Sequence, residues 1–148
     1  MWLWAAAALM SLGSCRLHTL ADGDYSLQVE EVLRDDCGLM NPPSDVQGAA
    51  RLRTEGNWVS LSFLEPQLRL VGNYLENTEA MALDGSLSNA STVLRGRACM
   101  LDVITFHLDA TTIDTHSFSG SMAINYVARQ PDECTCNFWF RYRAEAIQ

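Results

Sequence analysis

The chain has 148 residues, which is enough for one domain with its own core and too few for two. Hydrophobic residues make up 48% of it and charged residues 19%, so we exclude a disordered chain and a coiled coil. The formal net charge of −8 argues against nucleic acid as a partner, and because all 10 basic residues are arginine, chemistry that needs a lysine is excluded.

The N-terminal segment predicts export. The first 14 residues carry no charged side chain, and Trp2 to Leu12 form one apolar run. This run has the length of a signal-peptide core and is too short to span a bilayer. We predict that residues 1–14 are a signal peptide and that it is cleaved.

The apolar run ends in Leu12-Gly13-Ser14-Cys15, which resembles the lipobox of bacterial lipoproteins. The resemblance implies cleavage before Cys15, diacylglycerol and palmitate on this cysteine, and a short tether over residues 15–23. Arg16 follows the cysteine, which in enteric bacteria directs a lipoprotein to the outer membrane. We therefore expect a protein of the cell envelope, anchored to the membrane through its N-terminal lipid. The alternative is an ordinary secretory signal and a secreted protein.

Four further cysteines predict two disulfide bonds, since an even number in an exported chain is typical of oxidised pairs. They are Cys37, Cys99, Cys134 and Cys136. Cys134 and Cys136 cannot pair along a strand, where side chains two positions apart are about 7 Å from each other. We expect Cys37 and Cys99 each to bond to one of these two. The competing interpretation, a metal site at Cys134-Thr135-Cys136 with a histidine, has a shorter spacer than zinc motifs usually have.

Alternation with period two runs through residues 24–148, which we predict to be a single β domain. The first strand shows it clearly, with Tyr25, Leu27 and Val29 on one face. Turns at 55–56, 64–67 and 77–78 then give hairpins that keep one apolar face, which a slip of one residue would invert. The predicted pairs on this face are Leu52 with Val59, Ala50 with Leu61, Phe63 with Leu68, Leu61 with Leu70, Gly72 with Leu83, and Tyr74 with Met81.

The second half of the chain continues the strands. Residues 91–97 predict a short strand, and residues 99–108 are apolar on both faces, so we expect both faces to be covered. Residues 116–127 and 136–144 alternate again. Helical spacing is confined to a few residues between 38 and 49.

These strands predict an all-β fold, an antiparallel up-and-down meander that closes into a barrel of roughly eight strands. The alternative is a two-sheet β-sandwich. Gly72, Gly85 and Gly120 lie where a small barrel bends tightly. The strand pattern resembles that of lipocalin and avidin barrels, although Gly23-Asp24-Tyr25 stands in place of the lipocalin Gly-x-Trp, so no binding residue is transferred from that family.

The inward face supports our first hypothesis for function, a lipocalin-like container for a small apolar ligand. A barrel of this size is either filled by side chains or holds one such molecule. The candidate lining residues are Tyr25, Leu27, Val59, Leu61, Phe63, Leu70, Tyr74 and Phe140.

The outward face supports a second hypothesis, a filled barrel that binds an envelope protein or a glycan. The predicted register puts Arg53 beside Trp58, and Trp139, Arg141 and Arg143 share the outer face of the last strand. Tryptophan and arginine are the residues that most often anchor binding surfaces. The alternative is local cation–π pairing on an ordinary wall.

The sequence contains no catalytic motif, and we expect neither enzyme activity nor a cofactor nor a metal. One cluster supports a third hypothesis, a metal-dependent enzyme. His107, Asp109, Asp114 and His116 flank a predicted turn, where imidazoles and carboxylates can bind a divalent metal or exchange a proton. The alternative is that they are solvated residues at a strand end.

Overall fold

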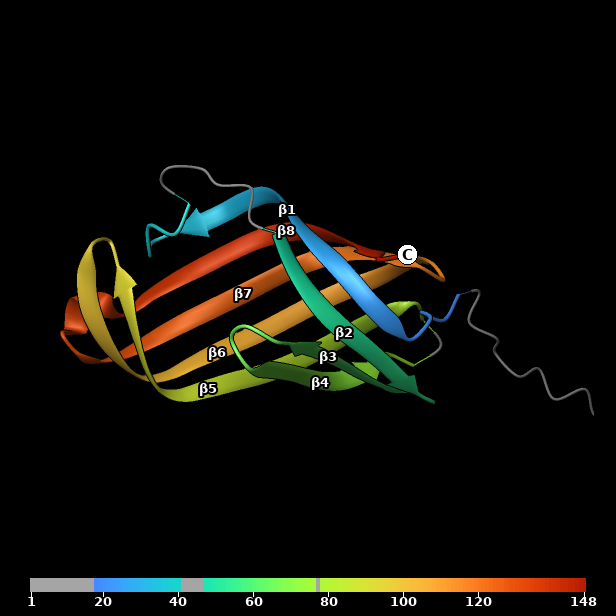
Figure 1. Ribbon diagram of the computed structural model, residues 1–148, viewed down its shortest axis with the longest axis horizontal. Coiled ribbons are helices and arrows are strands. Elements are labelled where there is room, and N and C mark those ends of the chain that lie inside the picture. The colour runs from blue at the N-terminus through green and yellow to red at the C-terminus, as the bar shows by residue number, and fades with distance from the viewer. Residues whose placement is uncertain (1–17, 41–46, 77) are drawn as a thin grey trace, which may run out of the picture.

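The computed structural model describes residues 18–40, 47–76 and 78–148. Eight antiparallel strands follow one another round a closed barrel, and the last strand pairs with the first (Figure 1). This arrangement confirms the predicted all-β meander in preference to a sandwich. No helix of the described residues is long and apolar enough to cross a membrane.

The elements comprise eight strands and one short 3-10 helix. They are β1 (Gly23–Asp35), β2 (Gln47–Glu55), β3 (Trp58–Phe63), β4 (Leu68–Tyr74), β5 (Ala80–Leu94), β6 (Arg97–Asp114), β7 (Ser117–Gln130), η1 (Asp132–Cys134) and β8 (Cys136–Ala146).

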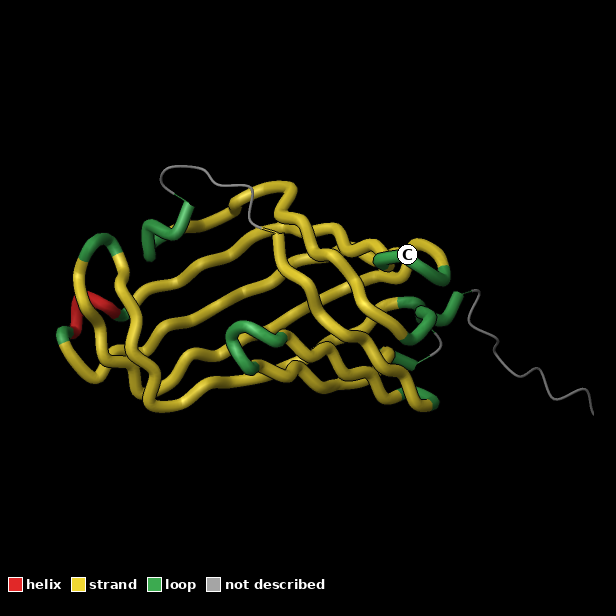
Figure 2. The backbone as a smooth tube through the Cα atoms, in the orientation of Figure 1, coloured by secondary structure: helices red, strands yellow, loops and turns green. Residues whose placement is uncertain are grey.

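The strands differ greatly in length, and this shapes the barrel. β2, β3 and β4 have 9, 6 and 7 residues, whereas β5 and β6 have 15 and 18, so the long strands extend past the short ones at one end (Figure 2). This end carries the disulfide bonds, and we call it the disulfide end. The other end receives the segment that precedes β1, and we call it the Leu20 end.

Two of the three predicted hairpin registers are correct. Leu61 pairs with Leu70 across β3 and β4, and Gly72 pairs with Leu83 across β4 and β5, as predicted. The β2–β3 register was wrong by two residues, since Leu52 pairs with Leu61. The turn consists of residues 56–57, with a positive φ of 60° at its glycine. A shift of two keeps every side chain on its predicted face.

Two predictions for the second half of the chain were wrong. Residues 91–97 are not a separate strand, because they contain the β5–β6 turn, where Arg95 and Gly96 have positive φ. Nor is β6 covered on both faces, since Met100 is 43% exposed while Leu101 is buried. Single apolar side chains on a surface are common, so apolar composition did not imply a second covered face.

A column of aromatic rings runs through the core. Tyr25 packs against Phe118 with ring centroids 5.4 Å apart, and Phe118 lies 6.0 Å from Tyr142. Phe140 and Phe138 continue the column, at 6.5 Å from Tyr142 to Phe140 and 4.9 Å between the phenylalanines. All five side chains are buried. The rings therefore connect the two ends of the barrel through its interior.

The tyrosine hydroxyls of this column remain hydrogen-bond donors. Tyr25 donates to the carbonyl of Ala21 over 2.8 Å, and burial raises the pKa of Tyr25 to about 12. Tyr142 donates to the carbonyl of Asp109 over 3.3 Å, and burial raises its pKa as well. A buried hydroxyl with a carbonyl partner avoids the cost of an unsatisfied polar group.

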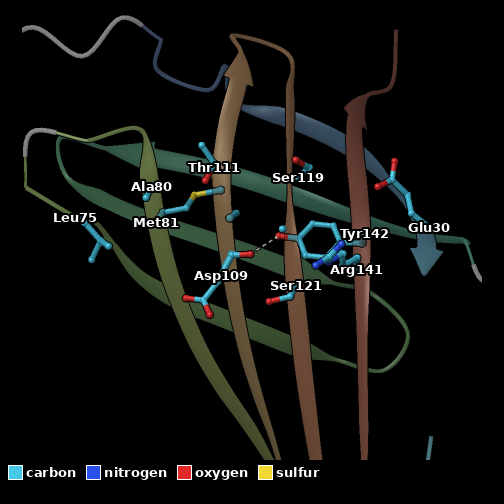
Figure 3. A pocket seen from close by; sticks show the side chains of 12 residues that line it. Glu30, Leu75, Ala80, Met81, Asp109, Thr111, Ser119, Ser121, Arg141 and Tyr142 are labelled. Atoms are coloured by element: carbon cyan, nitrogen blue, oxygen red, sulfur yellow. Dashed lines mark hydrogen bonds between the residues drawn. The ribbon is translucent and has the colours of Figure 1, made fainter. Parts of the chain in front are cut away.

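Three glycines, Gly72, Gly85 and Gly120, for which the sequence predicted tight bends, lie where neighbouring strands approach closely. At Gly120 a Cβ atom would overlap the carbonyl oxygen of Asp109 on the neighbouring strand. Because Gly120 has no side chain, the ring of Tyr142 reaches across β7 to β6 (Figure 3). The glycine thus allows both the strand approach and the aromatic packing.

Residues 18–22, which the sequence placed in a tether over residues 15–23, pack against the barrel. Leu20 is buried, and its backbone N–H donates to the hydroxyl of Tyr74 over 3.3 Å. The leucine joins the core at this end, which explains why residues 18–22 pack on it instead of extending. The predicted signal peptide and the predicted lipidation site at Cys15 lie outside the described residues, as do residues 41–46, half of the stretch for which helical spacing was predicted. The described part of that stretch contains no helix, and its residues 47–49 begin β2.

Both disulfide bonds follow the predicted pattern. Cys37 bonds to Cys136 and Cys99 bonds to Cys134, with Cα atoms 5.3 and 5.9 Å apart. The alternative of a metal site at Cys134 and Cys136 was therefore wrong, because oxidised sulfurs do not act as thiolate ligands. The bonded cysteines are separated by 99 and 35 positions in the sequence, so the bonds restrict the unfolded chain.

We expect Gly120→Ala to lower the free energy of unfolding by about 2 kcal/mol or more, since the added methyl group forces two strands apart. Gly48→Ala is the matched control, because its Cβ would be 3.9 Å from the Phe63 ring, an ordinary contact. We expect the control to change stability by less than about 1 kcal/mol. Urea-induced unfolding measures both, and equal effects would contradict the packing described for β7.

Candidate functional site

The eight predicted lining residues all belong to the core, as the sequence indicates. Phe63 is half-buried and packs against the core, and the other seven are buried: Tyr25, Leu27, Val59, Leu61, Leu70, Tyr74 and Phe140. Tyr25 also takes part in the aromatic column. These residues therefore contact other side chains of the same core.

The outer face of β2, β3 and β4 carries the most distinctive polar arrangement. Trp58 is 56% exposed, while Arg53 and Arg69 project from the two neighbouring strands. Between them lies Ser60, which points outward from β3 and is nevertheless only 7% exposed. The larger side chains therefore form walls above a small residue.

These walls enclose a groove of about 370 Å³, which we call the β3 groove. Its lining consists of Asp22, Arg53, Thr54, Glu55, Trp58, Val59, Ser60 and Arg69. The register places Ser60 between Arg53 on β2 and Val71 on β4. The groove is thus built on three paired strands, which hold its side chains more precisely than a loop would.

The predicted contact between Arg53 and Trp58 requires a correction. Arg53 pairs with Ser60, and Trp58 pairs with Glu55, because the β2–β3 turn lies one position later than predicted. Both side chains nevertheless line the β3 groove. Ser60 and Arg69 were missed, although the correctly predicted β3–β4 register puts Arg69 on this outer face.

The second predicted surface, on β8, forms a separate region. Trp139 is 46% exposed, and Arg141 and Arg143 share its face. Arg141 pairs with Glu31 over 3.2 Å, and Arg143 pairs with Glu145 over 2.8 Å. β1 and β2 separate this face from β3, so the two predicted tryptophan–arginine groups do not form one surface.

Another groove, of about 380 Å³, lies over β5 to β8 beside Tyr142 (Figure 3). Its lining includes Asp109, Ser121 and Arg141. The arginine is its one basic lining residue among the described ones, and it is already paired with Glu31. This groove therefore offers less to a charged ligand than the β3 groove does.

The predicted cluster at the β6–β7 turn does not form. β6 extends to Asp114, so His107 lies seven residues before the end of the strand, far from His116 in the turn. His116 and Asp114 remain together, with the backbone N–H of His116 donating to Asp114 over 2.8 Å. The metal-site hypothesis at this turn was therefore wrong in its geometry. The described residues contain no group of His, Cys, Asp and Glu arranged to hold a metal ion.

His107 instead lies between two carboxylates on the outer wall. Its Nδ1 is 2.6 Å from Asp84 Oδ1, and its Nε2 is 3.4 Å from Asp109 Oδ2. The hydrogen bond with Asp84 is the main cause that raises the pKa of His107, and the charge of Asp109 adds to it. The sequence hypothesis missed Asp84, because the contact depends on the long β5–β6 register.

Known proteins add no assignment to this geometry. No protein family, curated protein or solved structure matches the chain. The β3 groove is therefore the candidate site on the basis of its own residues.

We expect NMR titration to give His107 a pKa above 6.5, and Asp84→Asn to lower it more than Asp109→Asn does. Because the folded pKa is raised, the ion pairs stabilise the fold fully below pH of about 6.5, and this contribution is lost as the pH rises through the folded pKa. The imidazole is half exposed, so we expect a small effect on stability. An unchanged titration midpoint in Asp84→Asn would contradict the described contact.

Proposed function

We propose that this chain is an exported, membrane-anchored binding protein without enzymatic activity. Its barrel acts as a filled scaffold, and its outer face recognises an envelope protein or glycan through the β3 groove. One observation carries the proposal: the inward side chains form a single cluster of buried, contacting residues, whereas Trp58, Arg53 and Arg69 line a groove on the outer wall.

Export and anchoring are supported by the sequence and by the disulfide bonds. The Leu12-Gly13-Ser14-Cys15 pattern supplies a cysteine for lipidation. Disulfides persist in oxidising compartments outside the cytoplasm, and the chain has two. The proposed location is the cell envelope, with attachment through the lipid at Cys15.

Recognition through the outer face is supported by the chemistry of the β3 groove. A half-exposed indole offers a large rigid surface, and arginine offers directional hydrogen bonds to anionic or polar groups. These are the side chains that most often dominate binding energy at interfaces. The neighbouring strands fix their backbone positions, so a ligand would meet them already oriented.

Carriage of a small apolar ligand is the second candidate, and the unequal strands favour it. β1 pairs with β2 only between Gly23 and Gln28, and β5 pairs with β4 only between Met81 and Asp84. Towards the disulfide end these two ladders do not continue among the described residues, and Leu87 on the inner face is only half-buried. A half-buried leucine on the inner face is the kind of apolar surface that a small apolar molecule would cover.

We expect Trp58→Ala to weaken binding to cell envelopes isolated from the native host by about 30-fold or more, as for an anchor residue of an interface. Trp139→Ala is the control, since this tryptophan is similarly exposed and lies outside the β3 groove. Sedimentation of the purified, unlipidated chain with the envelopes measures the affinity, since a lipid at Cys15 would itself bind the membrane.

Unchanged binding in Trp58→Ala would contradict recognition through the β3 groove. Native mass spectrometry of the purified protein provides the complementary measurement. If the protein retains an apolar molecule and its envelope binding is unchanged in Trp58→Ala, carriage of a small apolar ligand would be favoured instead.

A further inference from the structure

The β3 groove is distinguished by arginines that have no acidic partner. Of the nine arginines that the structure describes, seven have a partner: Arg34, Arg51, Arg97, Arg129, Arg141 and Arg143 form ion pairs, and Arg95 donates to the carbonyl of Glu133. Arg53 and Arg69 form no ion pair or side-chain hydrogen bond with a described residue, and both line this groove. In a chain with a net charge of −8, two unpaired guanidinium groups at one site favour an anion.

The floor of the groove supplies an additional polar group. Ser60 is only 7% exposed, and its hydroxyl forms no hydrogen bond with any residue that the structure describes. The Ser60 hydroxyl is not among the fully buried side-chain atoms that lack a partner, so it stays accessible from the groove and can hydrogen-bond to a ligand with a polar edge. This observation is independent of the two arginines and points to the same place.

The acidic residues of the groove restrict the kind of anion. Asp22 accepts hydrogen bonds from the backbone N–H and the hydroxyl of Thr54, over 2.7 and 2.9 Å. Glu55 lies opposite Trp58 in the β2–β3 pairing. Two carboxylates repel a doubly charged phosphate more than a single carboxylate, and they accept hydrogen bonds from hydroxyl groups. The groove thus has two guanidinium groups that can bind one negative charge of a ligand, and carboxylates that can accept hydrogen bonds from its hydroxyl groups.

We propose that the β3 groove binds a carboxylated sugar, that is, a uronic-acid unit of an acidic glycan. This inference rests on the proposed function and specifies its ligand class. Arg53 and Arg69 bind the carboxylate, and Trp58 packs its indole face against the C–H groups of the sugar ring. Ser60 and the acidic residues bind the hydroxyls.

The test uses trigalacturonate as the probe and the full chain as the protein. Isothermal titration calorimetry measures the affinity. Because the chain has four tryptophans, contact with the Trp58 indole is reported by a change in tryptophan fluorescence that is lost in Trp58→Phe. The methyl ester of trigalacturonate keeps the rings and removes the charges. We expect the ester to bind about tenfold more weakly or worse, and we expect added salt to weaken the binding of the acid.

Variants assign the effect to the groove. We expect Arg53→Gln and Arg69→Gln each to weaken trigalacturonate binding about tenfold or more. Arg51→Gln is the matched control, because Arg51 lies on the same outer face of β2 but is paired with Asp24 and does not line the groove. An unchanged unfolding midpoint shows that each variant is folded.

The outcomes separate this inference from the proposed function. Absence of trigalacturonate binding, equal binding of acid and ester, or tighter binding of galactose 6-phosphate would each overturn the uronate assignment. In these cases envelope binding that depends on Trp58 would still support recognition through the β3 groove. Loss of the Trp58 dependence would overturn both.

Discussion

The pairing of β1 with β8 is the constraint on which the rest of the structure depends. Their ladder extends from Tyr25 opposite Ala146 to Asp35 opposite Phe138, and it closes the ring that seven hairpin-linked pairings leave open. Closure removes two exposed sheet edges and gives all inward side chains one common interior. The aromatic column exists because rings from β1, β7 and β8 meet there. At the disulfide end the Cys37–Cys136 bond links the segment that follows β1 to the first residue of β8.

A shared interior also explains why we place function on the outside. In every strand, alternate side chains point into the core, so only the outward-pointing side chains are available for recognition. On most of the wall the outward charges pair with one another, as Arg51 does with Asp24 and Arg129 with Asp102. The β3 groove differs because its arginines lack such partners among the described residues. The short strands β2 to β4 thus carry the candidate site, while the long strands carry most of the core.

The sequence predicted the face of the strand on which a side chain lies better than it predicted which residues pair across neighbouring strands. Alternation identified the inward side of each strand, and eliminating the Cys134–Cys136 pair left the observed disulfide pattern as one of two choices. Alternation cannot detect a shift of two, which is why Arg53 was paired with Trp58 instead of Ser60. The partners of His107 depend on the β5–β6 register, which the sequence did not give. That Arg69 forms no ion pair with a described residue depends on side-chain positions that no register supplies. The prediction that both faces of β6 are covered was wrong, because it relied on apolar composition and single apolar residues also occur on surfaces.

The central claim is that the closed ring is filled, so that ligands bind outside it. Xenon enters dry apolar cavities in proteins and is visible by X-ray diffraction, so crystals under xenon pressure test this claim most directly. The account predicts no xenon among Tyr25, Phe118 and Leu70. A well-occupied xenon site in contact with these side chains would contradict the claim. It would make carriage of an apolar ligand the favoured function.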